Sequence, residues 1–123
     1  MPTPRATGGD RVPPHPDIRA IDLQQVLEAL VDPVRRQIVA ELYAAGEDLA
    51  CGAIALPVSK STATHHFHVL RDAGLIRQHY AGTSRMNSLR GEEFDARFPG
   101  LLLAVVTAHG RDGRGTDAEK RGE

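Results

Sequence analysis

The sequence predicts a mainly α-helical domain with one small β-hairpin. Apolar residues recur at helical spacing in several segments of the first half of the chain. Capping residues, proline or glycine mark the ends of these segments. Two short β-favouring segments then flank a glycine turn. At 123 residues, the length favours a single domain with about five helices.

The composition of the two ends sets the expected domain boundaries. Residues 1–16 hold five of the eight prolines and few apolar side chains, so we expect a disordered N-terminal arm. Residues 110–123 are equally polar, and we expect a disordered tail there. The folded domain is therefore predicted to span residues 17–109. A unit of this size has a thin core, which favours help from a second subunit.

The first two helices are predicted over residues 21–30 and 33–45. Asp22 is the expected N-cap of the first helix. Asp32 is the expected N-cap of the second, with Pro33 at the first helical position, where its missing amide costs nothing. The apolar side chains of the first helix repeat at i, i+3, i+4 and i+7: Leu23, Val26, Leu27 and Leu30.

A short third helix is expected over residues 47–56 and a fourth over residues 59–75. Ser59 is a suitable N-cap of the fourth helix, and Gly74 stands where a left-handed residue ends a helix. Two helices joined by a short loop form the helix-turn-helix pattern.

The outer face of the fourth helix has the composition of a DNA-reading surface. Opposite the apolar stripe of Ala63, Phe67 and Leu70 lie short hydroxyl and imidazole side chains. A helix that is merely solvated would usually carry Glu/Lys pairs at i, i+4, and this one carries none. We therefore interpret it as a recognition helix.

A β-hairpin is predicted after this helix, with strands over residues 75–80 and 85–89 and a turn at Gly82. A helix-turn-helix followed by a hairpin is a winged helix. The hairpin tip, with Thr83, Ser84 and Arg85, is expected to lie along the phosphate backbone or the minor groove.

The charges are distributed unevenly along the chain. Residues 59–90 contain five basic residues and one acidic residue, whereas residues 17–58 contain three basic and seven acidic residues. This asymmetry favours a polyanionic partner for the second half; a chance fluctuation of surface charge is the alternative.

A last helix is predicted to begin at Leu101, and its first turns are apolar nearly all round. It is too short to cross a membrane and too apolar for an exposed surface. Burial against a partner subunit, together with the first helix, explains it; burial within one subunit is the alternative. Phe94 and Phe98, at i, i+4, are expected to pack on the core.

The remaining composition narrows the class of protein. Cys51 is the only cysteine, which excludes an intrachain disulfide and favours a cytoplasmic setting. No nucleophile–base–acid set and no glycine-rich phosphate loop is present, so we do not expect an enzyme. Cys51 remains open as either a thiol sensor or a small buried residue.

Two smaller questions also stay open from the sequence. His65 and His68 share a helical face at i, i+3 and could ligate a metal, although DNA or phosphate contact is the favoured reading. Arg35 and Arg36 could pair with acidic neighbours or contact phosphates.

Two segments resemble the ArsR-type (ArsR/SmtB) bacterial winged-helix repressors. Residues 30–39 are similar to the family's L-x-D-P-x-R-x-x-I-[LV] motif, and residues 59–75 to its S-x-x-x-[IVA]-S-x-H-L-x-x-L-x-x-A-G-L recognition helix. Gly82, Arg85 and Leu89 resemble the wing.

The resemblance implies a homodimer with terminal helices at the interface and recognition helices in successive major grooves of operator DNA. Such proteins usually repress transcription, often of their own operon, and many release DNA on binding an inducer. The predicted DNA-binding residues are Ser59, Lys60, Ser61, Thr62, Thr64, His65, His68, Arg71, Thr83, Ser84 and Arg85. The predicted dimer interface comprises Leu23, Val26, Leu27, Leu30, Leu101, Leu102, Val105 and Val106.

The sequence departs from the metal-sensing members of this family. Neither a cysteine pair nor a complete ligand set on the last helix is present, so no cofactor is predicted and a metal inducer is unsupported. Cys51 and His109 are the weak candidates for a sensor site. We therefore expect a dimeric autorepressor with an unknown inducer. The alternatives are a metal- or thiol-responsive receptor and a protein-interaction module that does not bind specific DNA.

Overall fold

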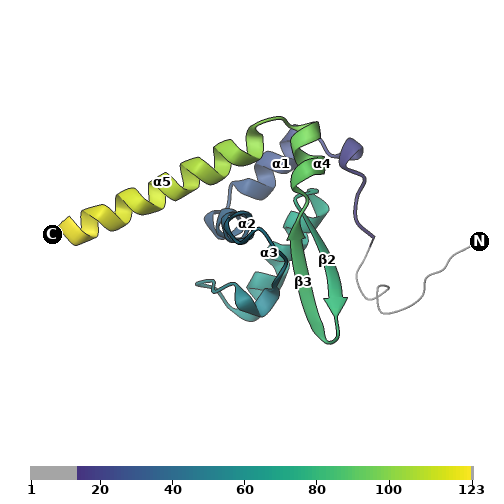
Figure 1. Cartoon of the computed structure of the whole chain (residues 1–123), viewed down its shortest axis with the longest axis horizontal. Helices are drawn as coiled ribbons and strands as arrows, with labels where there is room; N and C mark the ends of the chain where they lie inside the picture. Colours follow the sequence, from purple (N-terminus) through teal and green to yellow (C-terminus); the bar gives the residue numbers. More distant parts are fainter. Residues whose placement is uncertain (1–13, 123) are drawn as a thin grey trace, which may run out of the picture.

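The computed structural model describes residues 14–122, and from residue 114 onward only their backbone. Its five α-helices and three strands form the predicted winged helix-turn-helix (Figure 1). The elements are η2 (Ile18–Ala20), α1 (Leu23–Leu30), α2 (Pro33–Ala45), β1 (Leu49–Ala50), η3 (Cys51–Ala53), α3 (Lys60–Asp72), β2 (Ile76–Ala81), β3 (Ser84–Leu89), α4 (Gly91–Arg97) and α5 (Leu101–Gly122).

The caps of α1 and α2 are those that the sequence predicts. The Asp22 carboxylate accepts a hydrogen bond from Gln25 N, and the Gln25 side chain accepts one from Asp22 N, which completes a capping box. The Asp32 carboxylate accepts from Val34 N, and α2 ends at Gly46 in the left-handed conformation (φ 64°). Local side-chain chemistry therefore sets both helices.

Arg35 and Arg36 cap the C-terminus of α1. Arg35 donates to the carbonyl oxygens of Glu28 and Ala29, and Arg36 donates to those of Leu30 and Val31. The last carbonyls of a helix have no partner within it, and they form its negative end. Both arginines therefore fix the α1–α2 corner, which is neither of the two roles considered from the sequence.

The predicted third helix over residues 47–56 is wrong. The segment instead forms the two-residue strand β1 and the short 3-10 helix η3. β1 pairs antiparallel with β3, Leu49 opposite Asn87 and Ala50 opposite Met86. Backbone hydrogen bonds to a sheet have thus replaced those of a helix, in a segment whose central Gly52 is a poor helix former.

The hairpin is confirmed, and it forms part of a three-stranded antiparallel sheet in the order β1-β3-β2. β2 and β3 pair from Ile76–Leu89 at the base to Ala81–Ser84 at the tip. Gly82 has a φ of 65° and makes the turn between them. β2 is an outer strand of this sheet.

The core lies around α2, which contacts α1, α3, α5 and β3. Side chains from every layer are fully enclosed, among them Val26, Ile38, Phe67, Leu75 and Phe94. Phe94 and Phe98 pack ring against ring, with centroids 5.0 Å apart. The prediction that these two phenylalanines join the core is confirmed.

The last helix is longer than the sequence predicts. α5 runs from Leu101 to Gly122, through the expected boundary at residue 109, and its distal half projects from the body (Figure 1). The expected disordered tail from residue 110 is thus continuous helix here, since adding residues to an existing helix is far easier than starting one. No helix in the described part of the chain has the length and apolar character needed to cross a membrane.

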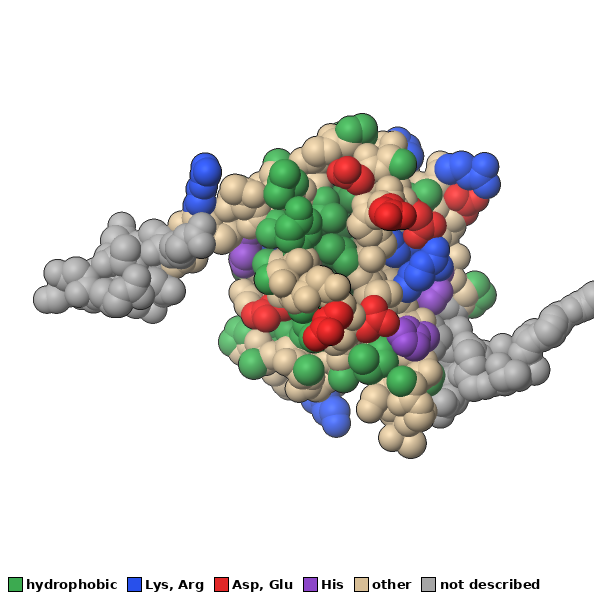
Figure 2. Space-filling model, in the orientation of Figure 1, with side chains coloured by type: hydrophobic (Ala, Val, Ile, Leu, Met, Phe, Trp, Pro, Cys, Tyr) green, Lys and Arg blue, Asp and Glu red, His purple; other side chains and the backbone are tan. Residues whose placement is uncertain are grey.

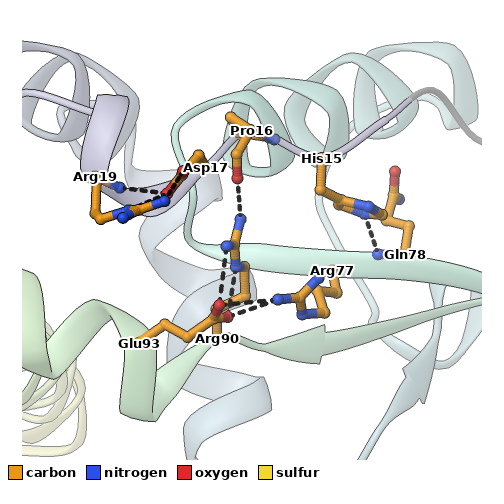
Figure 3. Close-up of polar contacts among 8 residues, drawn as sticks. All are labelled: His15, Pro16, Asp17, Arg19, Arg77, Gln78, Arg90 and Glu93. Atoms are coloured by element: carbon orange, nitrogen blue, oxygen red, sulfur yellow. Dashed lines mark hydrogen bonds and ion pairs between the residues drawn. The ribbon is translucent and has the colours of Figure 1, made fainter.

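The boundary of the N-terminal arm also differs from the prediction. Residues 1–13 lie outside the described part, but His15 and Pro16 bond to β2 and to Arg90, just after β3. His15 Nε2 accepts a 2.9 Å hydrogen bond from Gln78 N on the outer edge of β2, and the Pro16 carbonyl accepts one from Arg90 (Figure 3). Residues 15 and 16 are therefore part of the folded unit.

Candidate nucleic-acid interface

The recognition helix α3 has defined ends. Ser59 Oγ accepts from Thr62 N at 3.2 Å at the start. At the other end Gly74 (φ 80°) and Leu75 donate to the carbonyl oxygens of Arg71 and Leu70. These two bonds make a Schellman motif, which leads the chain directly into β2.

One face of α3 is buried and the other is open, as the periodicity predicts. His66, Phe67 and Leu70 are buried. The exposed face begins at the helix N-terminus, where free amides and the helix dipole favour a phosphate. It carries Lys60, Ser61, Thr62, Thr64 and His65.

The hydroxyl groups on this face already make local hydrogen bonds. Ser59 donates to Thr62 Oγ1 at 3.0 Å, and Thr64 Oγ1 donates to the Lys60 carbonyl at 3.0 Å. A hydroxyl group whose hydrogen is already donated in one hydrogen bond can still accept another through its oxygen lone pairs. In this arrangement Thr64 can accept from the amino groups that cytosine and adenine present in the major groove. The ammonium of Lys60 has no partner within the described part of the chain.

Arg85 joins the wing to α3. Its Nη1 lies 3.2 Å from His68 Nε2, and its Nη2 donates to the Tyr80 hydroxyl at 2.9 Å. Its guanidinium also lies 5.3 Å from the centroid of the Tyr80 ring. The sequence did not indicate a role for Tyr80, because the residue pattern of a strand does not show that Arg85 of the neighbouring strand will contact its hydroxyl and ring.

His68 is a neutral acceptor in this arrangement. A guanidinium has no acceptor atom, so Nε2 of His68 must accept and the ring proton must lie on Nδ1. Burial lowers the pKa of His68, and the positive charges of Arg71 and Arg85 lower it further. His68 is thus half-buried and contacts the wing as a neutral ring, so in the free protein it is not the exposed phosphate-contacting side chain that the sequence predicted.

Arg71 does not lie on the exposed face. Its side chain is 6 % exposed; Nη1 donates to Gln78 Oε1, and Nε and Nη2 donate to Asp72 Oδ1, all at 3.2 Å. Gln78 in turn donates to Asn87 Oδ1, and Asn87 donates to the Leu49 carbonyl and to Cys51 Sγ. Arg71 is therefore one end of a buried polar chain that fixes α3 to the three-stranded sheet.

Two further basic side chains of residues 59–90 are likewise paired within the protein. Arg77 and Arg90 both bind the Glu93 carboxylate, at 2.8 Å each, with Arg90 buried (Figure 3). The hydrogen bond from Arg90, followed by that from Arg77, lowers the pKa of Glu93 to about 2. The positive charge that remains for a polyanion comes from Lys60 and from Arg85 at the wing.

His66 fixes α3 against α2. Its Nδ1 lies 3.0 Å from Arg35 Nη1, and burial lowers its pKa, with the charge of Arg35 adding to the effect. The two residues are 31 positions apart, so no sequence pattern indicated the pair.

The predicted dimer-interface residues fall into two groups. Val26, Leu30 and Leu102 are buried within the chain itself, so they are unavailable to a partner. Leu23 and Leu27 are 49 % and 47 % exposed. Leu101, Val105 and Val106 are half-buried against the core.

The weak sensor candidates are both engaged in structural contacts. Cys51 is half-buried and accepts from Asn87 Nδ2 at 3.2 Å. His109 Nδ1 accepts from Arg36 Nε at 3.3 Å. Across the described residues, no three His, Cys, Asp or Glu side chains are grouped so as to hold a metal ion.

Comparison with known proteins agrees with this geometry. A helix-turn-helix domain family matches residues 30–79, from the end of α1 into β2. The HTH-type transcriptional regulator YceK of Bacillus subtilis (strain 168) is 36 % identical over 80 residues, which cover 63 % of this chain and 80 % of YceK.

Two solved structures have the same fold. An ArsR family transcriptional regulator superimposes with a TM-score of 0.54 at 29 % identity, over 60 % of this chain and 81 % of that one. An ArsR-like transcriptional regulator from Rhodococcus sp. RHA1 does so with a TM-score of 0.52 at 25 % identity, over 80 % and 84 %. These relatives are all named as transcriptional regulators. With a helix-turn-helix, an exposed recognition face and a wing in place, this chain belongs to the ArsR-type winged-helix regulators and is a DNA-binding transcriptional regulator.

Proposed function

We propose that this regulator acts as a homodimeric repressor of its own operon and that an inducer releases it from DNA. In this proposal α1 and the first half of α5 form the dimer interface. Two copies of α3 then enter successive major grooves, about 34 Å apart. Autorepression and release are what the family resemblance suggests, and the dimer has support in this chain.

One observation carries the proposal: large apolar side chains on α1 and at its C-cap stay about half exposed or more within the described part of the chain. Leu23, Leu27 and Val31 are 49 %, 47 % and 71 % exposed, although α1 otherwise belongs to the core. Apolar side chains that gather on one face of a small domain mark an interaction surface. A two-fold interface that uses the same patch on both subunits would cover them.

Protein–DNA contacts would then divide between anchoring and reading. Lys60 and the first-turn amides of α3 would hold phosphates, and Ser61, Thr62, Thr64 and His65 would reach base edges. No arginine or asparagine lies on this face, so strong bidentate readout of guanine or adenine is absent. Half-site spacing and DNA shape would therefore carry much of the specificity.

A charge at Leu27 tests the proposed dimer. Sedimentation velocity of the wild type should show a dimer, and Leu27→Asp should give a folded monomer. Gln24→Asp adds the same charge one turn earlier on α1, at an exposed polar position, and should leave the dimer intact. A wild-type monomer, or a Leu27→Asp dimer, would contradict this interface.

Binding of DNA from the region upstream of the gene tests autorepression. Fluorescence anisotropy should show tight, salt-sensitive binding to this duplex and weak binding to a scrambled one. Leu27→Asp should lose most of the specific affinity, because a monomer contacts only one half-site. Equal affinity for both duplexes would rule out autorepression while leaving DNA binding itself in place.

A further inference from the structure

One groove of the molecule is lined by no residue of α3. It measures about 440 Å³ and lies between the end of α2, the end of β3, α4 and the start of α5. Its volume falls within the range of small-molecule sites, roughly 300–1,000 Å³. The side chains that matter for its chemistry are Tyr43, Leu89, Glu92, Asp95, Leu102 and Leu103.

The floor and walls of this groove are apolar. Tyr43 is 41 % exposed and Leu103 is 55 % exposed, so both present apolar surface to solvent here. Gly91 and Gly100 also line it, and a Cβ atom at either would meet nothing within 4 Å. The groove therefore offers hydrophobic and aromatic surface with open backbone beside it.

The rim carries negative charge. Glu92 has no partner within the described residues, and Asp95 accepts only a long 3.4 Å bond from Gly100 N. A neighbouring recess shares Tyr43, Leu89 and Gly91 with the groove and adds two further carboxylates. These are Glu47 and Asp48.

No described lysine or arginine lines either recess, although Asp48 lies 3.7 Å from His79, and Arg77 and Arg90 line a third recess that shares Glu92 with the groove. Figure 2 shows this face, with a hydrophobic patch beside the start of α5 and Asp and Glu side chains on both sides of it. Apolar surface beside Glu92 and Asp95, which form no ion pair within the described residues, is complementary to an amphipathic cation.

The groove borders the start of α5, which belongs to the proposed dimer interface, but no residue of α1 lines it. At about 100° per residue, Leu103 lies on the opposite side of α5 from Leu101 and Val105. A second copy placed on the groove would also bring two sets of carboxylates together, which costs free energy. The charge of the carboxylates therefore disfavours a second copy seated directly on the groove.

We propose that the groove binds a small organic cation with an apolar or aromatic body. Glu92 and Asp95 would face its positive charge, the ring of Tyr43 would add a cation–π contact, and the leucines would cover its apolar body. The groove touches both the base of the wing, at Leu89, and the start of α5. A ligand there would act on the DNA-binding and dimerisation elements together. This regulatory effect rests on the proposed function, whereas binding of the ligand to the groove does not depend on it.

A pair of probe ions of one shape and opposite charge tests the proposal. Isothermal titration of the full chain, without DNA, should show saturable binding of tetraphenylphosphonium. Tetraphenylborate, its isosteric anion, should not bind at this site. Glu92→Gln and Asp95→Asn should each weaken tetraphenylphosphonium binding by about fivefold, as expected for loss of one partly exposed charge contact. Asparagine at position 95 keeps an acceptor for Gly100 N, so circular dichroism should be unchanged.

Glu28→Gln is the matched control, because it removes the same charge from α1, outside the groove. It should leave the affinity for tetraphenylphosphonium unchanged. Equal binding of both ions, no binding of either, or equal weakening by Glu28→Gln would overturn the proposal. Because these readouts need no DNA, they stand apart from the operator experiments. Binding that leaves operator affinity unchanged would confirm the site and contradict only its role in release.

Discussion

At the scale of single residues, basic side chains in the DNA-binding half do two different jobs. The arginines at positions 71, 77 and 90 bind carboxylates or amides of the chain itself, whereas Lys60 points to solvent without a partner. A guanidinium has five donors in a fixed fork, which suits it to holding elements together. A lysine at the start of a helix is a point charge suited to a phosphate. Residue type alone does not separate these roles, but burial does.

Substitution of Arg71 should destabilise the protein without changing the ionic part of DNA binding. Arg71→Met keeps most of the apolar stem but leaves Gln78 Oε1 buried without its donor. The free energy of unfolding should fall by about 2 kcal/mol. Urea denaturation measures this change, and the salt dependence of DNA binding should be unaltered.

Lys60→Met is the contrasting variant. Its free energy of unfolding should stay within about 0.5 kcal/mol of wild type. The slope of log affinity against log salt should become shallower by about 1, because one phosphate contact is lost. The assignment would fail if Arg71→Met changed the salt slope and Lys60→Met did not.

Acid should weaken the fold through its buried histidines. Burial is the main cause that lowers the pKa of His15, His66 and His68 below 6.5. The unfolded chain therefore binds more protons than the folded one between 6.5 and these lowered pKa values, and stability rises with pH there. The contribution of the neutral rings is fully present above pH 6.5 and is lost as pH falls toward the folded pKa values.

Urea titrations at pH 7.5 and 5.5 measure this effect. The free energy of unfolding should be smaller at pH 5.5, and His15→Gln should reduce the difference between the two pH values. An unchanged or greater stability at pH 5.5 would contradict the neutral state of these histidines.

At the scale of elements, two glycines set how the recognition helix and the wing are joined. Gly74 and Gly82 both have positive φ, 80° and 65°. A Cβ at Gly82 would meet only open space, whereas one at Gly74 would lie 2.9 Å from Ile18 Cδ1 and 3.2 Å from Ile21 Cγ1. The residue type at Gly74 is therefore restricted by both the backbone conformation and the packing, whereas at Gly82 it is restricted by the backbone conformation alone.

Alanine at each position should separate these two restrictions. Gly82→Ala should cost about 1 kcal/mol, the strain of a left-handed residue that has a Cβ. Gly74→Ala should cost more, by about a further 1 kcal/mol, because Ile18 and Ile21 must move. Thermal and urea unfolding of the pair measures the difference, and equal losses would show that packing against η2 plays no part.

The elements that the sequence predicted well are those with local end signals. Asp22, Asp32, Ser59 and Gly74 each act within a few residues of their own position, so their effect could be read from the chain. The segment over residues 47–56 could not, because its conformation depends on pairing with β3, almost forty residues away. The extent of α5 was missed because polar composition was taken to mean disorder.

The recognition surface was predictable by periodicity and its interior partners were not. The 3.6-residue repeat correctly divided α3 into a buried and an exposed side, apart from the half-buried His68 and Arg71 at the helix end. The pairs Arg85–His68, Arg71–Gln78 and Arg35–His66 all cross between elements. Such pairs depend on how the elements pack, which a single sequence does not specify.

At the scale of the whole molecule, three surfaces lie on one small scaffold. α3 and the wing form the DNA face, α1 carries exposed leucines, and an acid-rimmed groove adjoins the start of α5 (Figures 1 and 2). α2 contacts an element of each surface, α3, α1 and α5. A change at one face can therefore reach the others through a single packed helix.

Selection of bound duplexes from a random DNA pool tests the central claim most directly, because it assumes nothing about which gene is controlled. Two copies of α3 related by a two-fold axis should enrich an inverted repeat whose half-site centres are about 10 base pairs apart. A variant with Thr64→Ala and His65→Ala should enrich a weaker motif at the same spacing. A pool without an enriched motif, or one with a single unrepeated site, would contradict a dimer that reads DNA through α3.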